Sequence, residues 1–129
     1  MAMTKAELDG VVHRALDVGD VESAVIFVLT PDQTELRLAA AAGIAGPALE
    51  GLVAAVRNPG HPIVRTLADA DPTFDVLPMN PGGPRLRSHL PLRAGGATLG
   101  VLAVAHQSPT SDDERTALIA LATEAAAAI

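Results

Sequence analysis

The chain has 129 residues, which is long enough for one domain with a buried core and too short for two. Its formal net charge of −6 excludes the concentrated basic surface that nucleic-acid binding needs. It has no cysteine, which excludes disulfides, thiolate catalysis and cysteine-ligated zinc. We therefore expect a single domain over residues 1–129 that binds no nucleic acid.

Two features of the sequence bear on location. The longest apolar candidate for a membrane span, residues 38–49, is interrupted by Gly43, Gly46 and Pro47. The first ten residues lack the apolar centre of a signal peptide. We expect a cytoplasmic protein that does not associate with a membrane.

The first 42 residues predict a helix followed by a β-hairpin. Thr4 and Glu7 match a capping box, and apolar residues at helical spacing follow until a stop at Gly19. The segment 23–30 is apolar and β-branched, whereas 35–42 begins with alternating apolar and charged residues. The turn residues between these segments predict that the two strands pair.

The middle of the chain predicts two short helices and an irregular, proline-rich loop. The spacing over 62–69 favours a helix capped by His61, with a strand over 62–67 as the alternative. Residues 69–84 hold four prolines around a short strand at 73–77, and we expect the loop to lie over the sheet. An earlier helix begins at Gly46-Pro47, and its apolar stripe, which we expect to be buried, is Leu49, Leu52, Val53 and Val56.

The stretch 86–106 is the centre of the predicted sheet. Apolar residues alternate over 86–93, and two glycines at 94–97 suit a tight hairpin turn. Residues 98–106 are apolar at almost every position, which is typical of a strand covered on both faces. A second capping box at Ser111 predicts a final, alanine-rich helix that a partner could approach closely.

One face of the strand 86–93 is polar, because Arg87, His89 and Arg93 share it. If this face lines a pocket, a guanidinium and an imidazole would converge on an anion such as a carboxylate or phosphate. The alternative is a solvated surface strand. We expect His13 and His106 to be surface residues.

Three acids of the proline-rich region lie close in sequence. They do not follow the spacing of an EF-hand calcium loop, so we expect solvated turn residues rather than a cation site. The three are Asp69, Asp71 and Asp75.

The order of these elements resembles the GAF domain, a small sensory module of signalling proteins. The likeness spans residues 4–129 and is strongest in PDQTELRLAAAAGI, PLRAGGATLGVLAVAH and SDDERTALIALATEAAAAI. The resemblance implies an α+β, GAF/PAS-like fold with a central antiparallel sheet of about five to six strands. The N- and C-terminal helices, which often dimerise in this family, would cover one face of the sheet. Short helices, the proline-rich loop and a ligand pocket would lie on the other.

The chain also departs from several members of this family. Bilin attachment and free-methionine-sulfoxide reduction use cysteines in this family, and the chain has none. The Asn-Lys-Phe-Asp-Glu signature of cyclic-nucleotide-binding members does not occur. We expect no catalysis, no bound metal and no cofactor.

We therefore predict a non-catalytic sensing or signalling module, in which a small anionic or apolar ligand binds between the sheet and the segment 63–84. The terminal helices would then report its presence. The alternative is a ligand-free domain for homodimerisation or protein interaction, whose dimer Ala125→Glu would break. The candidate ligand-binding residues are Arg87, His89, Met79 and Arg65.

Overall fold

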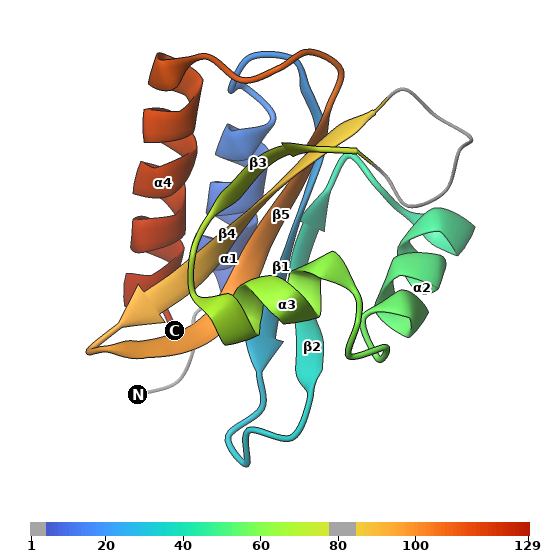
Figure 1. Ribbon diagram of the computed structural model, residues 1–129, viewed down its shortest axis with the longest axis vertical. Coiled ribbons are helices and arrows are strands. Elements are labelled where there is room, and N and C mark those ends of the chain that lie inside the picture. The colour runs from blue at the N-terminus through green and yellow to red at the C-terminus, as the bar shows by residue number, and fades with distance from the viewer. Residues whose placement is uncertain (1–4, 78–84) are drawn as a thin grey trace.

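In residues 5–77 and 85–129, which the computed structural model describes, the protein forms a five-stranded antiparallel sheet with helices on both faces (Figure 1). The strand order is β2-β1-β5-β4-β3. This is the α+β architecture that the sequence predicts. The elements are α1 (Lys5–Ala15), β1 (Val21–Leu29), β2 (Leu36–Ala42), α2 (Gly46–Ala55), α3 (Pro62–Asp69), β3 (Thr73–Val76), β4 (Leu86–Ala94), β5 (Ala97–His106) and α4 (Asp112–Ala127).

β5 is the middle strand, in agreement with its continuous apolar pattern. Leu102 and Val104 belong to the core on one face of the sheet, and Val101 and Ala103 to the core on the other. The hairpin that joins β4 to β5 turns at two glycines, and both have the positive φ that the sequence predicts for this turn.

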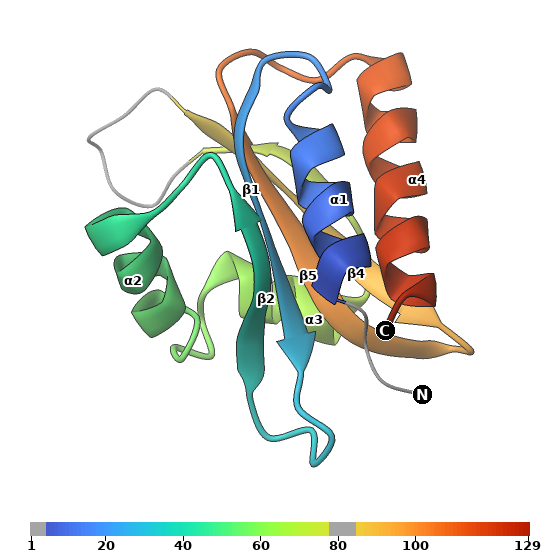
Figure 2. The ribbon, with the colours of Figure 1, turned by 180° about the vertical axis from the view of Figure 1, so that it is seen from behind.

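α1 and α4 lie side by side on one face of the sheet (Figure 2). Leu8, Val12, Leu118 and Ala122 form the buried stripes of the two helices. The capping box at the start of α4 is present as predicted. Ala125 is fully buried in this core, so it does not lie on an outer interface. The placement of Ala125 at a dimer contact is therefore wrong, and Ala125→Glu does not test a dimer, because this change would bury a charge inside the domain.

α2 and α3 cover the opposite face. Residues 62–69 are helical, so the alternative strand over 62–67 is wrong, and Ile63 anchors α3 in the core. His61 caps α3 as predicted, because its Nδ1 accepts the Ile63 amide at 3.1 Å. In α2, by contrast, no residue between Gly46 and Ala55 is fully buried, although Val56 just after it is. The predicted stripe of α2 is half-buried because the helix stands away from the sheet.

Several local predictions change. α1 ends at Ala15 rather than at Gly19, and three short turn bonds follow it before Gly19 takes a φ of 53°. His106 is buried at 1% exposure instead of lying at the surface, and its ring contacts the buried Ser88 hydroxyl and the Ser108 carbonyl. Thr4, Met79 and the proline-rich loop from residue 78 to 84 lie outside the described residues. None of the helices in the described ranges is long and apolar enough to span a membrane.

Candidate functional site

A pocket of about 460 Å³ lies between the sheet and the α2–α3 layer. Its floor comes from β1, β4 and β5, and its walls come from α2, α3 and the end of β3. The half-buried face of α2 leaves this space open. The apolar lining includes Val25, Leu52, Ile63, Val76 and Ala103, and the basic lining is His61, Arg85, Arg87 and His89.

Strand alternation places two of the basic groups. Arg87 and His89 lie on the pocket face of β4. The residues that alternate with them, Ser88 and Leu90, lie on the face that α1 and α4 cover. His61 enters from the N-cap of α3. The structure thus brings together Arg87 and His89, as predicted, and adds His61, which the sequence placed only as a helix cap.

His89 is buried at 2% exposure, and its Nδ1 lies 3.3 Å from the Thr73 hydroxyl. Burial lowers the pKa of His89 to about 4, and the charges of His61 and Arg87 add to this effect. Burial and Arg87 also lower the pKa of His61. Both rings are therefore neutral at pH 7. Because His61 Nδ1 accepts an amide proton, its own ring proton is on Nε2.

Positive charge dominates the pocket. The Nε of Arg85 lies 2.8 Å from the carboxylate of Glu22, which balances that guanidinium. Among the described residues, no carboxylate pairs with Arg87. The pocket can therefore hold a small molecule whose anionic group pairs with Arg87 and whose apolar part contacts Val25 and Ala103 in the floor.

Two other residues considered from the sequence, Arg65 and Arg93, are not brought to this pocket. Arg65 is exposed on α3 and is not among the residues that line it. Arg93 is also exposed, and its Nη2 donates to the Gly96 carbonyl at 3.4 Å. Helical phase turns Arg65 outward, and a bulge after Leu92 changes the register of β4 before Arg93.

A larger pocket, of about 700 Å³, lies beside the β1–β2 hairpin and the far ends of α2 and α3. Its charged groups are less suited to a ligand. Arg37, with a side chain 75% exposed, pairs with Glu35 at 3.1 Å. Arg57 at the rim is exposed as well. Exposed, paired charges contribute little to recognition, so we favour the smaller, more buried site.

A serine, a histidine and an aspartate meet on the α4 face, although the sequence indicated no catalytic triad. Ser88 Oγ lies 2.8 Å from His106 Nε2, and Asp75 Oδ1 lies 3.9 Å from the same nitrogen. Ser88 has no exposed surface, and Nδ1 of the ring contacts the Ser108 carbonyl rather than Asp75. This is not the geometry of a nucleophilic triad. No group of three or more metal-ligating side chains gathers within residues 5–77 and 85–129.

The fold and its pocket define a class of small α+β domains, with paired terminal helices on one face and a ligand-sized site on the other. The family model of the GAF domain matches residues 5–129. The chain therefore belongs to the GAF domain family, whose members generally act as small-molecule sensing or regulatory modules.

Solved structures of GAF domains share this architecture. The GAF domain of an Acinetobacter phosphoenolpyruvate-protein phosphotransferase superposes with a TM-score of 0.76 at 15% identity, over 99% of this chain and 82% of that one. The second GAF domain of DevS from Mycobacterium smegmatis is 26% identical, with a TM-score of 0.71 over 97% of this chain and 92% of that one.

An enzyme has the same fold. A type II free methionine-R-sulfoxide reductase from Thermoplasma acidophilum gives a TM-score of 0.72 at 15% identity, over 96% of this chain and 90% of that one. At this identity the likeness concerns the fold alone. A comparison with curated protein sequences found no significant match.

Proposed function

We propose that this GAF domain is a non-catalytic sensor that binds a small anionic molecule in the pocket between the sheet and α2–α3. Arg87 supplies the charge that recognises the anion, and His61 and His89 supply neutral hydrogen-bonding groups beside it. The terminal helices on the opposite face transmit the bound state to a partner. The cytoplasmic location predicted from the sequence stays a prediction.

The observation that carries this proposal is the basic lining of a half-buried pocket. Burial, with a smaller effect from the charge of Arg87, lowers the pKa of both histidines, so two neutral rings lie beside a guanidinium that pairs with no carboxylate among the described residues. An anion would pair with this guanidinium in a partly desolvated site, where charge-assisted hydrogen bonds are strong. The enzymatic alternative lacks support from the residues, since the chain has no cysteine thiol and its buried Ser88–His106 pair is closed to substrate.

A binding experiment tests the proposal. Small mono- and dicarboxylates and inorganic phosphate are titrated into the whole chain, with thermal stabilisation and amide NMR shifts as readouts. We expect at least one of these anions to stabilise the protein and to shift the amides of His89 and Ala103. Arg87→Gln should weaken binding by on the order of tenfold or more, because it removes a charge-assisted hydrogen bond.

Arg93→Gln is the matched control. It removes the same charge from the same strand but from an exposed position outside the pocket. We expect the affinity of this variant to equal that of the unmodified chain. Absence of binding by every anion of the panel, or equal losses in the two variants, would contradict the proposed recognition.

A second function, self-association, is favoured by the outer face of α4. Ile119 is 45% exposed there, among the small exposed residues Ala120 and Thr123. Small neighbours allow a second helix to approach closely, and Ile119 would then be buried in the contact. We propose a homodimer of this chain through α4, which is compatible with sensing.

A further inference from the structure

The short edge strand β3 contains a strained residue. Asp75 has a φ of 58°, a left-handed conformation that is uncommon for residues with a side chain. The pairing with β4 shifts at this point, because Thr73 is opposite His89 and Val76 is opposite Arg87. An advance of three residues along β3 thus corresponds to two residues along β4, so β3 contains a β-bulge. Such strain persists only where the surroundings hold it in place.

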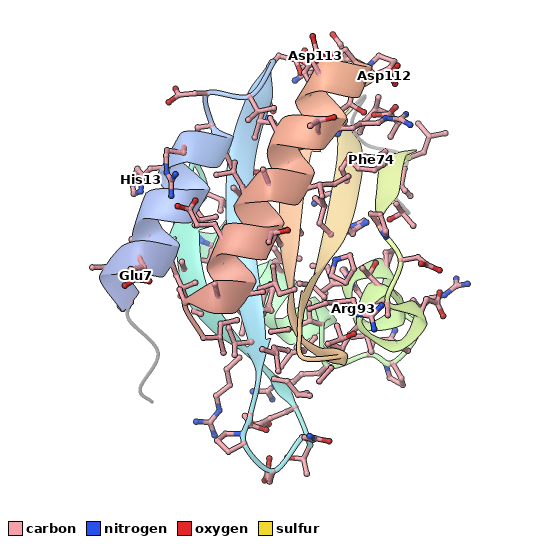
Figure 3. All side chains as sticks on the ribbon, turned by 90° about the vertical axis from the view of Figure 1, so that its left-hand side faces the viewer. Glu7, His13, Phe74, Arg93, Asp112 and Asp113 are labelled. Atoms are coloured by element: carbon pink, nitrogen blue, oxygen red, sulfur yellow. The ribbon has the colours of Figure 1, made fainter. Side chains whose placement is uncertain are left out.

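The side chain of Asp75 holds the start of α4. Oδ1 accepts from the Thr110 amide at 2.9 Å and from the Thr110 hydroxyl at 3.1 Å, and Oδ2 accepts from Arg115 Nη2 at 2.9 Å. Burial opposes ionisation of this carboxyl, but the bonds from Thr110 and Arg115 prevail and lower its pKa. The Arg115 guanidinium also stacks 4.8 Å from the centre of the Phe74 ring. Figure 3 shows Phe74 next to α4, near the end that carries Asp112 and Asp113.

The backbone of Asp75 is held by a buried relay. Its amide donates to Ser88 Oγ at 3.2 Å. A carbonyl only accepts, so His106 Nδ1 donates to the Ser108 carbonyl at 2.8 Å, and Nε2 of the same ring shares a hydrogen bond with the Ser88 hydroxyl at 2.8 Å. These bonds connect β3, β4 and β5 with the segment that leads into α4.

The same strand also borders the pocket. Val76 and Leu77 belong to its lining, and the Thr73 hydroxyl contacts His89. β3 is four residues long and lies at the end of the sheet, where β4 is its neighbour. A short edge strand with a bulge can move at a lower cost than the central strands.

We propose that β3 couples the pocket to α4: displacement of Val76 by a ligand moves the Asp75 bulge and loosens the bonds of Asp75 to Thr110 and Arg115. The two states of the coupling element are Asp75 bound to α4 and Asp75 released from it. This inference rests on the proposed sensing function, because the ligand supplies the displacement. It goes beyond that function by naming the route through which α4 responds.

The test does not need a ligand. In Val76→Phe the larger side chain occupies part of the pocket and imitates its filling. We expect the amide NMR signals of Thr110 and Arg115 to shift in this variant. The same substitution is then made together with Asp75→Asn. Asparagine tolerates a positive φ but removes the charge that holds Arg115. In this background we expect the shifts at Thr110 and Arg115 to be lost.

Asp71→Asn is the matched background, because Asp71 is an exposed acid of the same region. There, the response to Val76→Phe should persist. If the Asp75→Asn protein does not fold, Arg115→Gln breaks the same ion pair from its more exposed side and should also abolish the response. Unchanged signals at Thr110 and Arg115 in Val76→Phe would overturn the coupling, as would equal shifts in the Asp75→Asn and Asp71→Asn backgrounds. A failure to bind anions would instead count against the sensing function alone.

Discussion

At the scale of single residues, Gly100 lies at a close approach between neighbouring backbones of the sheet. This glycine lies in the central strand β5, opposite Val28 of β1 and Leu92 of β4. A Cβ at this position would collide with the carbonyl oxygen of Phe27. Both neighbouring strands are held by ladder hydrogen bonds, so the backbone cannot give way without loss of pairing.

We expect Gly100→Ala to lower the free energy of unfolding by about 1–3 kcal/mol, because the added methyl overpacks the core. Gly10→Ala is the comparison. Gly10 lies inside α1, and a Cβ there meets nothing within 4 Å. This change should stabilise the protein by roughly 0.5–1 kcal/mol, the usual gain of alanine over glycine in a helix. Urea unfolding of the two variants measures both values, and a loss at Gly10 as large as that at Gly100 would contradict the steric explanation.

At the scale of elements, α4 has one buried face and one exposed face. Leu118, Ala122 and Ala125 pack against the sheet and α1, whereas Ile119 and Thr123 point outward. The sequence predicts the buried face because its spacing is local and regular. The same spacing places Ala125 on this face, and its burial overturns the dimer contact that the alanine-rich composition suggested there.

We expect Ile119→Glu to convert a dimer into a folded monomer, because a charge would replace an apolar residue at the α4 contact. Ala125→Glu should instead unfold the domain, since a carboxylate has no room or partner in that core. Light scattering gives the oligomeric state and circular dichroism gives the fold. A monomeric unmodified chain at high micromolar concentration would contradict the dimer, as would a dimer that survives Ile119→Glu.

Local sequence patterns predict the fold better than they predict the contacts of buried polar residues. Arg87 and His89 were predictable as one face because strand alternation is a property of neighbours in sequence. The bonds of Asp75 to Ser88 and Arg115 join residues 13 and 40 positions apart, and a bulge turns Asp75 toward α4. Neither the pairing nor the bulge leaves a periodic signal. For the same reason Asp75 was mistaken for a solvated turn residue and His106 for a surface residue.

At the scale of the whole molecule, the sheet separates two hydrophobic cores. One core joins it to α1 and α4, and the other joins it to α2 and α3 around the pocket. The pocket requires polar groups to be buried beside the second core, chiefly His89. The stability of the whole domain should therefore depend on the protonation of the pocket.

The pKa of His89 falls from 6.5 to about 4 in the folded chain. As pH falls below about 6.5, the unfolded chain binds a proton that the folded chain refuses until about pH 4. Stability should therefore decrease over this window, by up to about 3 kcal/mol for a shift of this size. His61 acts in the same direction, because its pKa is also lowered.

Urea unfolding between about pH 7.5 and about pH 4.5 measures the dependence of stability on pH. His89→Gln should flatten the slope, whereas His13→Gln, an exposed control on α1, should leave it unchanged. Equal slopes for the unmodified chain and His89→Gln would show that His89 stays accessible to protons in the folded state.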